Sequence, residues 1–265
     1  YNTGSVAGSS FNVGGVVGRN YSSSTVSNSY NTGTVTGSGS YVGGVVGYNY
    51  YSIVTNSYNT GSVTGSSHVG GVVGDNYASS TVSNSYNTGS VAGSSFNVGG
   101  VVGRNYSSST VSNSYNTGTV TGSGSYVGGV VGYNYYSIVT NSYNIGSVTG
   151  VSVVGGVVGY SGSSSTVSNS YNTGTVTGSS YVGGVVGRNS SSTVLNCYYG
   201  GGCASSVGGI NSADVDGQAE YLGTITTDAK TLSWYSSTSG NWNATYPWDF
   251  TYVWALDSSV NDGYP

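Results

Sequence analysis

The stretch Val-Gly-Gly-Val-Val-Gly at residues 13–18 decides the fold of this chain, because it returns at a nearly constant interval. Each copy lies in a longer unit that begins with Tyr-Asn, in most cases as Tyr-Asn-Thr-Gly, and carries Thr-Val-Ser-Asn-Ser or a close variant near its end. A fixed interval over many units is typical of repeat architectures. The six further copies occupy residues 42–47, 69–74, 98–103, 127–132, 154–159 and 182–187.

The units are 27 to 29 residues long, and a longer period overlies them. Residues 1–57 recur unchanged as residues 86–142, which indicates duplication of a block of three units. The small differences in unit length fall between the Val-rich stretches, where turns on the surface of a solenoid can absorb them. The units begin at Tyr1, Tyr30, Tyr58, Tyr86, Tyr115, Tyr143 and Tyr171, and an eighth begins at Tyr198.

Within one unit, three short stretches favour β-strands: residues 33–37, 41–47 and 53–58. They are rich in Val, Thr and Tyr and are bounded by Gly, Asn or Ser. None shows a period of 3.6 residues, and Gly is too frequent for a helix. The sequence therefore predicts an all-β fold: a parallel β-solenoid of about seven coils, with neighbouring coils paired strand on strand.

This arrangement predicts which side chains stack along the solenoid. The Val that follows the opening Tyr-Asn by four residues, as at Val35, forms one inward column. Side chains alternate along a strand, so one of the pair Val16 and Val17 must point outward or lie at a bend. An Asn recurs in register after the hexapeptide, and its amides can hydrogen-bond along the axis. That column contains Asn20, Asn49, Asn76, Asn105, Asn134 and Asn189, with Ser161 in the remaining coil.

The composition excludes several classes of partner. Only 5% of the 265 residues are charged, and the formal net charge is −4. Seven of the eight acidic residues follow the repeats, so the repeat region carries only Asp75 and three arginines. It lacks the basic surface that nucleic acid requires. No run of 18 apolar residues predicts a membrane span.

The units resemble the GLUG-type repeats of large bacterial and archaeal surface proteins, including adhesins and non-catalytic parts of proteins similar to IgA peptidases. The matching residues are Tyr-Asn-Thr-Gly-Thr-Val-Thr-Gly and Val-Gly-Gly-Val-Val-Gly-Tyr-Asn within residues 30–49, together with their copies up to residue 197. Residues 226–230 and 248–257 resemble the family's usual C-terminal ending. The resemblance implies a parallel β-solenoid on an extracellular surface, and it implies no reaction. Family units often carry Cys just before the opening Tyr; here Ser stands in that column except at Cys197.

The composition changes after the repeats, which predicts two regions: a β-solenoid over residues 1–197 and a small Trp-rich C-terminal cap or assembly region over residues 198–265. A solenoid needs a cap because its end exposes unpaired backbone groups. Residues 227–232 could form one helical turn in this region. In an extracellular protein Cys197 and Cys203 could form a disulfide across a short loop, or remain two thiols.

No pattern of residues indicates an active site, a cofactor or a metal site, and we expect the chain not to be an enzyme. His68 is the single histidine, and Val153 stands at its position in the duplicated block, so we expect a structural histidine. The residue after each hexapeptide varies among Arg, Tyr and Asp, which suits an exposed position. Asp75 and Arg104 would lie in successive coils and could form an exposed ion pair contributing at most ~1 kcal/mol.

Tyrosines cluster near that variable position and could form a stripe that stacks on sugar rings or on a neighbouring rod. Scattered surface tyrosines are the alternative. The candidate stripe contains Arg19, Tyr48, Tyr50, Tyr51, Arg104, Tyr133, Tyr135, Tyr136, Tyr160 and Arg188.

These observations favour a non-enzymatic structural protein at the cell surface, as a filament subunit or an adhesin stalk. We expect assembly with itself, head to tail through uncapped solenoid edges, or binding to a cell-surface glycan. A glycan-binding or cell-surface-binding adhesin module that uses the tyrosine stripe is the alternative. Ice binding ranks lower: Thr32, Thr34 and Thr36 are regularly spaced, but the corresponding positions in the first unit end in Ala7 and break the array.

Overall fold

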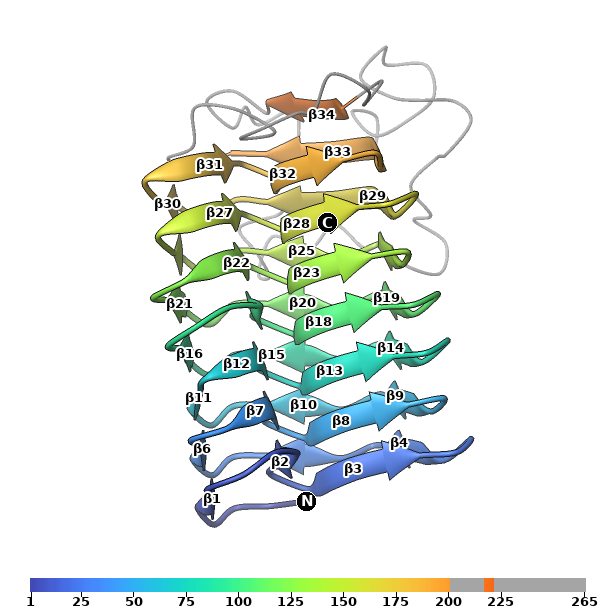
Figure 1. The fold of residues 1–265 in the computed structure, drawn as a ribbon, viewed down its shortest axis with the longest axis vertical. Coiled ribbons are helices and arrows are strands. Elements are labelled where there is room, and N and C mark those ends of the chain that lie inside the picture. The colour runs from blue at the N-terminus through green and yellow to red at the C-terminus, as the bar shows by residue number, and fades with distance from the viewer. Residues whose placement is uncertain (201–216, 222–265) are drawn as a thin grey trace, which may run out of the picture.

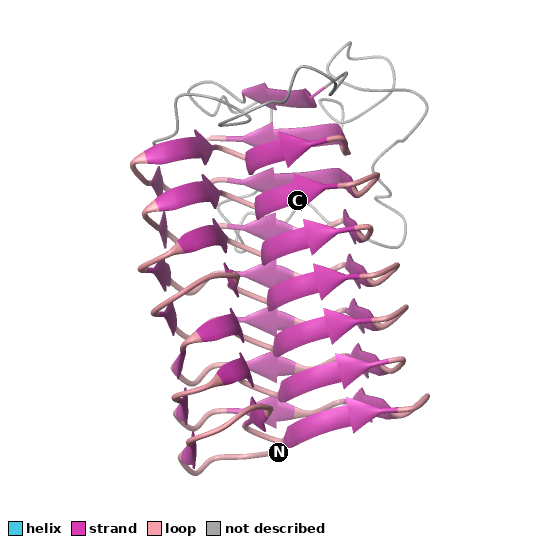
Figure 2. Ribbon diagram, viewed as in Figure 1, coloured by secondary structure: helices cyan, strands magenta, loops and turns pink. Residues whose placement is uncertain are grey.

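The computed structural model describes residues 1–200 and 217–221, the latter only in their backbone. Its described residues form a parallel β-solenoid of about seven coils, which stack along one axis from the N-terminus upward (Figure 1). Strands and turns make up the described part of the chain, and it contains no helix (Figure 2). The predicted fold class is confirmed. The Trp-rich cap, the helical turn at 227–232 and the family-like ending at 248–257 lie outside the described residues.

Each coil contributes one strand to a first sheet, whose strands begin at the predicted inward Val. The register aligns Val6 with Val35 and continues coil by coil to Val176, so this Val column is confirmed. The strands of the first sheet are β1 (Val6–Gly8), β6 (Val35–Gly37), β11 (Val63–Gly65), β16 (Val91–Gly93), β21 (Val120–Gly122), β26 (Val148–Thr149) and β30 (Val176–Thr177).

The second and third sheets contain the two halves of the Val-Gly-Gly-Val-Val-Gly stretch. The second sheet contains β2 (Val13–Gly14), β7 (Ser40–Gly43), β12 (Ser67–Gly70), β17 (Val98–Gly99), β22 (Ser125–Gly128), β27 (Ser152–Gly155) and β31 (Ser180–Gly183). The third sheet contains β3 (Val17–Tyr21), β8 (Val46–Tyr50), β13 (Val73–Tyr77), β18 (Val102–Tyr106), β23 (Val131–Tyr135), β28 (Val158–Gly162) and β32 (Val186–Ser190).

The fourth sheet is formed by two ladders that join where β29 (Thr166–Asn172) runs through both. One ladder contains β4 (Thr25–Ser27), β9 (Ile53–Thr55), β14 (Thr81–Ser83), β19 (Thr110–Ser112) and β24 (Ile138–Thr140). The other contains β5 (Tyr30–Asn31), β10 (Tyr58–Asn59), β15 (Tyr86–Asn87), β20 (Tyr115–Asn116) and β25 (Tyr143–Asn144). β33 (Thr193–Tyr199) pairs with β29 and runs through the predicted domain boundary at residue 197, and β34 (Gly217–Tyr221) adds one more parallel strand.

The prediction of three strands per coil was wrong, because two of the three stretches bend. Residues 53–58 divide into β9 and β10 at Asn56, whose φ of 50° is left-handed. An Asn occupies the same place in every coil, and Asn tolerates this conformation better than most residues. Residues 41–47 divide into β7 and β8 at a bend over Gly44 and Val45.

That bend determines how three valines of one stretch enter the core together. The amides of Val45 and Val46 both donate to the carbonyl oxygen of Val72 in the next coil, at 3.0 and 2.9 Å. The two side chains therefore do not alternate, and both are completely buried with Val42. The prediction that one member of the adjacent Val pair lies at a bend is confirmed.

Two ladders of buried asparagines connect the coils inside the core. The predicted ladder is confirmed for five of its six asparagines: the side chains of Asn20, Asn49, Asn76, Asn105 and Asn134 form a chain of amide hydrogen bonds of 2.8 to 2.9 Å. Beyond Ser161, Asn189 donates instead to the carbonyl oxygen of Ser192 in its own coil. The second, which we call the inner Asn ladder, follows the opening Tyr of each unit and was not predicted. Its members are Asn2, Asn31, Asn59, Asn87, Asn116, Asn144 and Asn172, with hydrogen bonds of 2.6 to 2.8 Å.

The inner Asn ladder explains the second glycine of the hexapeptide. A Cβ added at Gly71 would lie 2.6 Å from Asn87 Oδ1 and would overlap Asn87 Cγ and the backbone oxygen of Gly100. The same overlap, with the ladder Asn and the carbonyl of the next coil, recurs at Gly15, Gly44, Gly100 and Gly129. Glycine is therefore required where the backbone passes the ladder.

We predict that Gly71→Ala destabilises the protein by about 2–3 kcal/mol, because neither the ladder nor the backbone can move aside without breaking its hydrogen bonds. Gly4→Ala is the matched control. A Cβ at the exposed Gly4 would meet only Asn2 Oδ1, at 3.8 Å, and its effect should stay within about 0.5 kcal/mol. Urea unfolding of both variants measures the difference, and equal midpoints would contradict the account of this glycine.

Candidate binding face

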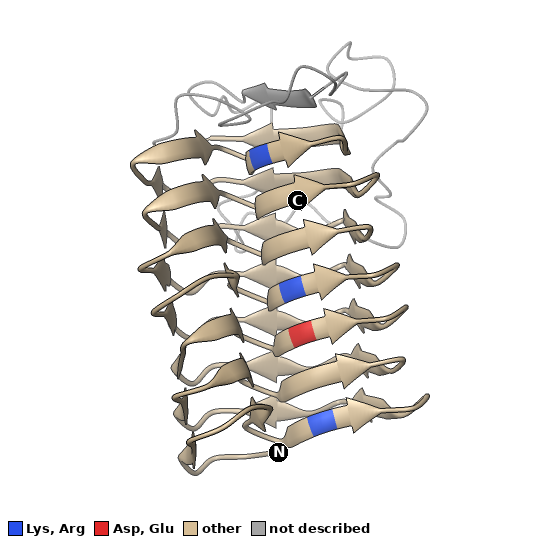
Figure 3. Ribbon diagram, in the orientation of Figure 1, with Lys and Arg blue, Asp and Glu red and all other residues tan. Residues whose placement is uncertain are grey.

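The outward side of the third sheet and the turns beside it form the candidate site, which we call the aromatic face. Its central column contains the variable residue after each hexapeptide, and the strand register aligns these residues from coil to coil. The column contains Arg19, Tyr48, Asp75, Arg104, Tyr133, Tyr160 and Arg188. Every charged side chain in the described part of the solenoid, residues 1–200, belongs to this column (Figure 3).

A second column of tyrosines lies two residues further along the same strands. Their ring centroids follow one another along the axis 4.8 to 5.5 Å apart, and the rings are stacked except for Tyr50 and Tyr77, which are tilted by 39°. Tyr51 and Tyr136 follow in left-handed turns and place their rings edge-on against Tyr50 and Tyr135, at 4.7 and 4.8 Å. The column contains Tyr21, Tyr50, Tyr77, Tyr106 and Tyr135.

The third column of the face comes from the turn or strand that leads into the second sheet, at a left-handed residue. Tyr41, Tyr126 and Tyr181 occupy this position, with φ between 51° and 67°. In the first and fourth coils an Asn occupies this position and a Phe lies just before it, as at Phe11 and Asn12. Tyr41 contacts Tyr48 with a centroid distance of 5.4 Å, so this column adjoins the central one.

The structure places all ten residues of the predicted stripe on this face. Arg19, Tyr51 and Tyr136 are exposed, and the other seven are half-buried. Sequence reasoning missed the third column, including Phe11 and Tyr41, because its residues differ from coil to coil. It also missed Tyr21, Tyr77 and Tyr106, which follow the stacked Asn by one residue. That spacing was visible and could have identified them.

The expectation of an exposed position and an exposed ion pair at Asp75 was wrong. Asp75 is completely buried, and the Arg104 side chain is 24% exposed. Arg104 donates two hydrogen bonds to the carboxylate, from Nε at 2.9 Å and from Nη2 at 2.7 Å. The guanidinium also lies within 6.0 Å of the ring centroids of Tyr41, Tyr77 and Tyr106. These large rings cover the pair and exclude water from the carboxylate.

Burial governs the titration of the polar groups around this pair. It raises the pKa of the Asp75 carboxyl, although Arg104 opposes part of the shift. It lowers the pKa of His68 to about 3, with a further contribution from the Arg104 charge, so the imidazole is neutral at pH 7. His68 Nδ1 is buried without a hydrogen-bond partner among the described residues, and the ring packs 5.0 Å from Tyr41. This environment suits the structural role predicted for His68.

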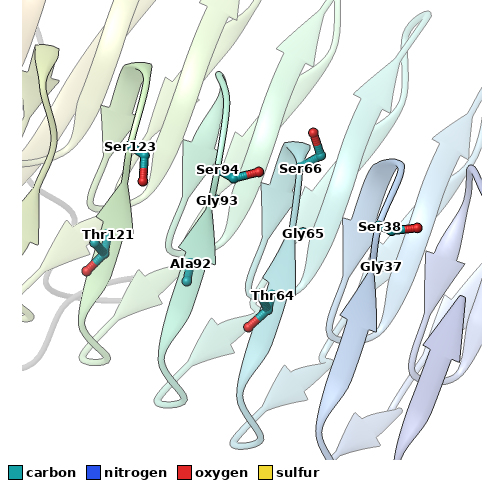
Figure 4. A pocket seen from close by; sticks show the side chains of 10 residues that line it. All are labelled: Gly37, Ser38, Thr64, Gly65, Ser66, Ala92, Gly93, Ser94, Thr121 and Ser123. Carbon is teal, nitrogen blue, oxygen red and sulfur yellow. The ribbon is translucent and has the colours of Figure 1, made fainter. Parts of the chain in front are cut away.

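A shallow groove on another part of the solenoid has different chemistry (Figure 4). It has a volume of about 440 Å³ and runs across four coils at the corner between the first and second sheets. Its lining is small and uncharged, and Ala92 lies between Thr64 and Thr121 in one column. Alanine therefore interrupts the threonine array here, as Ala7 does in the first coil.

Cys197 continues the Ser column that precedes each opening Tyr, aligned with Ser170. It is completely buried, and its thiol donates to the carbonyl oxygen of Leu195 at 3.1 Å. Burial raises the thiol pKa to about 12. Cys203 lies outside the described residues, so the disulfide stays a prediction. The described residues contain no group of three His, Cys, Asp or Glu side chains that could hold a metal ion, and no helix long and apolar enough to cross a membrane.

Coils of 27 to 29 residues, parallel in-register sheets and stacked side-chain columns define the class as a parallel β-solenoid. The particular repeat is the GLUG motif, whose family model matches residues 9–36, 38–64, 94–121 and 123–149. The chain thus contains GLUG motif repeats at four positions, as the sequence resemblance predicted. These four matches fall in the two duplicated copies of residues 1–57 and their immediate continuations.

Among solved structures, the chain is similar to a protein from Bacteroides ovatus described as a "putative immunoglobulin A1 protease". The sequences are 18% identical, the TM-score is 0.48, and the match covers 80% of this chain and 67% of the other. No curated protein matches the sequence.

We predict that Arg104→Gln costs about 3 kcal/mol or more, because it leaves the Asp75 carboxylate buried without its partner. Arg19→Gln is the matched control: the residues around Arg19 in sequence are identical, but Arg19 is exposed, and its loss should cost no more than about 0.5 kcal/mol. Chemical denaturation at pH 7 measures both. Equal losses would show that Asp75 is solvated.

We predict that acid destabilises the protein in part through His68. Because its folded pKa of about 3 lies below the ordinary value of 6.5, the unfolded chain binds a proton first. Stability should therefore fall as the pH is lowered from about 6.5 toward 3, by up to ~1.4 kcal/mol per unit.

His68→Val should remove this part of the pH dependence, since Val153 occupies the same position in the duplicated block. Urea midpoints measured between pH 7 and pH 3.5 test it. Parallel profiles for the variant and the original protein would show that His68 is protonated in the folded state.

Proposed function

We propose that this chain is a non-enzymatic structural rod that works outside the cell, at the cell surface, as a filament subunit or an adhesin stalk. The observation that carries the proposal is the in-register stack of coils, in which main-chain pairing repeats at every step along the axis and two buried Asn ladders connect neighbouring coils, one of them interrupted at Ser161. Each coil is held by its neighbours through the same contacts. Such a stack resists bending and can hold other parts of a surface protein apart.

The chemistry of the reactive side chains also supports a structural role. The carboxylate of Asp75 is held by Arg104, the imidazole of His68 is neutral and covered by aromatic rings, and the thiol of Cys197 is buried with a raised pKa. Catalysis by such groups needs them within reach of a substrate and of one another. The low charge of the repeats and their many Ser, Thr and Asn residues suit an extracellular setting.

Head-to-tail assembly would reuse the contact between successive coils. The coil faces are nearly identical, so the edge of one rod can pair with the edge of another through parallel strands. A contact between two different ends does not close and therefore builds a fibre. A stalk would instead contain the same rod within one longer chain.

Electron microscopy of the purified chain tests this proposal. We expect either separate rods, about 34 Å long for seven coils spaced ~4.8 Å apart, or fibres whose axial repeat is close to that of one molecule. Compact particles without an axis would contradict the structural role. On the producing cells, gold-labelled antibody should bind without permeabilisation; labelling only after permeabilisation would contradict the extracellular location.

The second candidate function is an adhesin module that binds glycans or another cell surface through the aromatic face. It is favoured by the three adjoining columns of Tyr, Phe and Arg, because aromatic rings offer broad apolar surfaces on which sugar rings stack. Exposed rings such as Tyr51 and Tyr136, at 52% and 55%, are accessible to a ligand. A glycan array without signal above background would count against this function.

A further inference from the structure

A pocket of about 390 Å³ lies at one end of the aromatic face, between the first two coils. Its lining contains Phe11, Asn12 and Arg19 from the first coil and Tyr41 and Tyr48 from the second. The volume lies in the range of small-molecule sites, and the lining combines apolar rings with few polar groups, as such sites usually do.

Three aromatic rings form the apolar part of this pocket. The centroids of Phe11 and Tyr41 are 6.0 Å apart, and those of Tyr41 and Tyr48 are 5.4 Å apart. The rings are tilted by 39° and 48°, so they do not pack flat on one another. Phe11 is 61% exposed. An exposed aromatic ring beside two further rings suits the apolar face of a sugar ring.

Arg19 supplies the charge of the pocket. Its guanidinium lies 4.5 Å from the ring centroid of Tyr21 and 5.5 Å from that of Tyr48, which holds the planar group over the pocket wall. Among the described residues no carboxylate pairs with it, since Asp75 pairs with Arg104. An exposed, oriented guanidinium favours a planar carboxylate, which it can bind through two parallel hydrogen bonds.

The duplicated block provides an internal comparison. Phe96, Asn97, Arg104, Tyr126 and Tyr133 repeat the five lining residues without a change in sequence. There, however, Arg104 is already bound to a carboxylate, that of Asp75, through two hydrogen bonds. The duplicated sequence thus shows that an arginine in this setting binds a carboxylate.

The phenols complete the polar part of the site. Burial raises the pKa of Tyr48 to about 12, with Asp75 contributing and the two nearby arginines opposing. Its hydroxyl is therefore protonated at pH 7 and can donate a hydrogen bond. The amide of Asn12 can donate and accept, which matches the hydroxyl groups of a sugar.

We infer that this pocket binds a carboxylated sugar, with the carboxylate on Arg19 and the sugar ring against Tyr41, Tyr48 and Phe11. The inference rests on the second candidate function, the binding of glycans by the aromatic face, and specifies its ligand as a uronic acid unit. An uncharged sugar of the same shape would keep the stacking and lose the charged contact.

Titration calorimetry of the chain 1–265 with methyl β-glucuronide and methyl β-glucoside tests the inference, because the two probes differ at one carboxylate. We expect the glucuronide to bind about tenfold more tightly or better, and added salt to reduce this preference. Arg19→Gln should abolish the preference and leave weak binding of the glucoside. Arg188→Gln, at the same column position in the seventh coil, should retain the preference, and circular dichroism should show that both variants keep the fold.

Three results would overturn the inference. Equal binding of the two sugars would show that Arg19 does not bind the carboxylate. The proposal that the aromatic face binds glycans would remain valid. Equal binding of N-acetylaspartate and the glucuronide would show a plain carboxylate site without recognition of a sugar. Failure of both sugars to bind would remove the glycan function of the face together with the inference.

Discussion

The structure depends on one constraint: in the first six coils the backbone passes so close to a buried Asn ladder that only glycine fits there. Asn87 illustrates the arrangement. Its Nδ2 donates to Asn116 Oδ1 in the next coil and to the carbonyl oxygen of Gly89, while its Oδ1 accepts from Asn59 Nδ2. Each amide is fully used in a dry interior, where a polar group without a partner is costly. The ladder therefore fixes the position of every coil relative to the next.

A fixed register converts each position of the repeat into a column along the rod. The opening tyrosines show this most clearly. From Tyr1 to Tyr171 their rings stack with centroids 4.8 to 5.1 Å apart and planes within 6° of parallel. The same rule creates the Val columns of the core and the three columns of the aromatic face. A single substitution in one repeat thus alters one site on a surface that otherwise repeats, as Asp75 does.

The coil number, the parallel sheets, the Val column and one Asn ladder could be predicted, because each follows from the spacing of residue types alone. The bends could not. They depend on left-handed residues such as Asn56 and on two amides sharing the carbonyl of Val72, which are tertiary details. The inner Asn ladder was missed although its Asn follows every opening Tyr, since an Asn two residues before a Gly also suits a turn.

The candidate site was also predicted only in part, because residue spacing determines which residues share a face but not how deeply they are buried. Register identified the residues that share the face, including the alignment of Asp75 with Arg104. It could not predict their burial, because that depends on how rings from neighbouring coils, such as Tyr41 and Tyr77, cover the pair. Nor could it show that Phe11 and Asn12 complete a pocket, since that depends on how their turn packs against the rings of the next coil, such as Tyr41.

The most direct test of the central claim is the free energy of unfolding of Asn87→Ala. Removal of this amide leaves Asn116 Oδ1 and the carbonyl oxygen of Gly89 buried without their partner, so the account predicts a loss of about 3 kcal/mol or more. A loss below about 1 kcal/mol would contradict it. That result would mean that the Val columns hold the coils together and that the ladder only fills space between them.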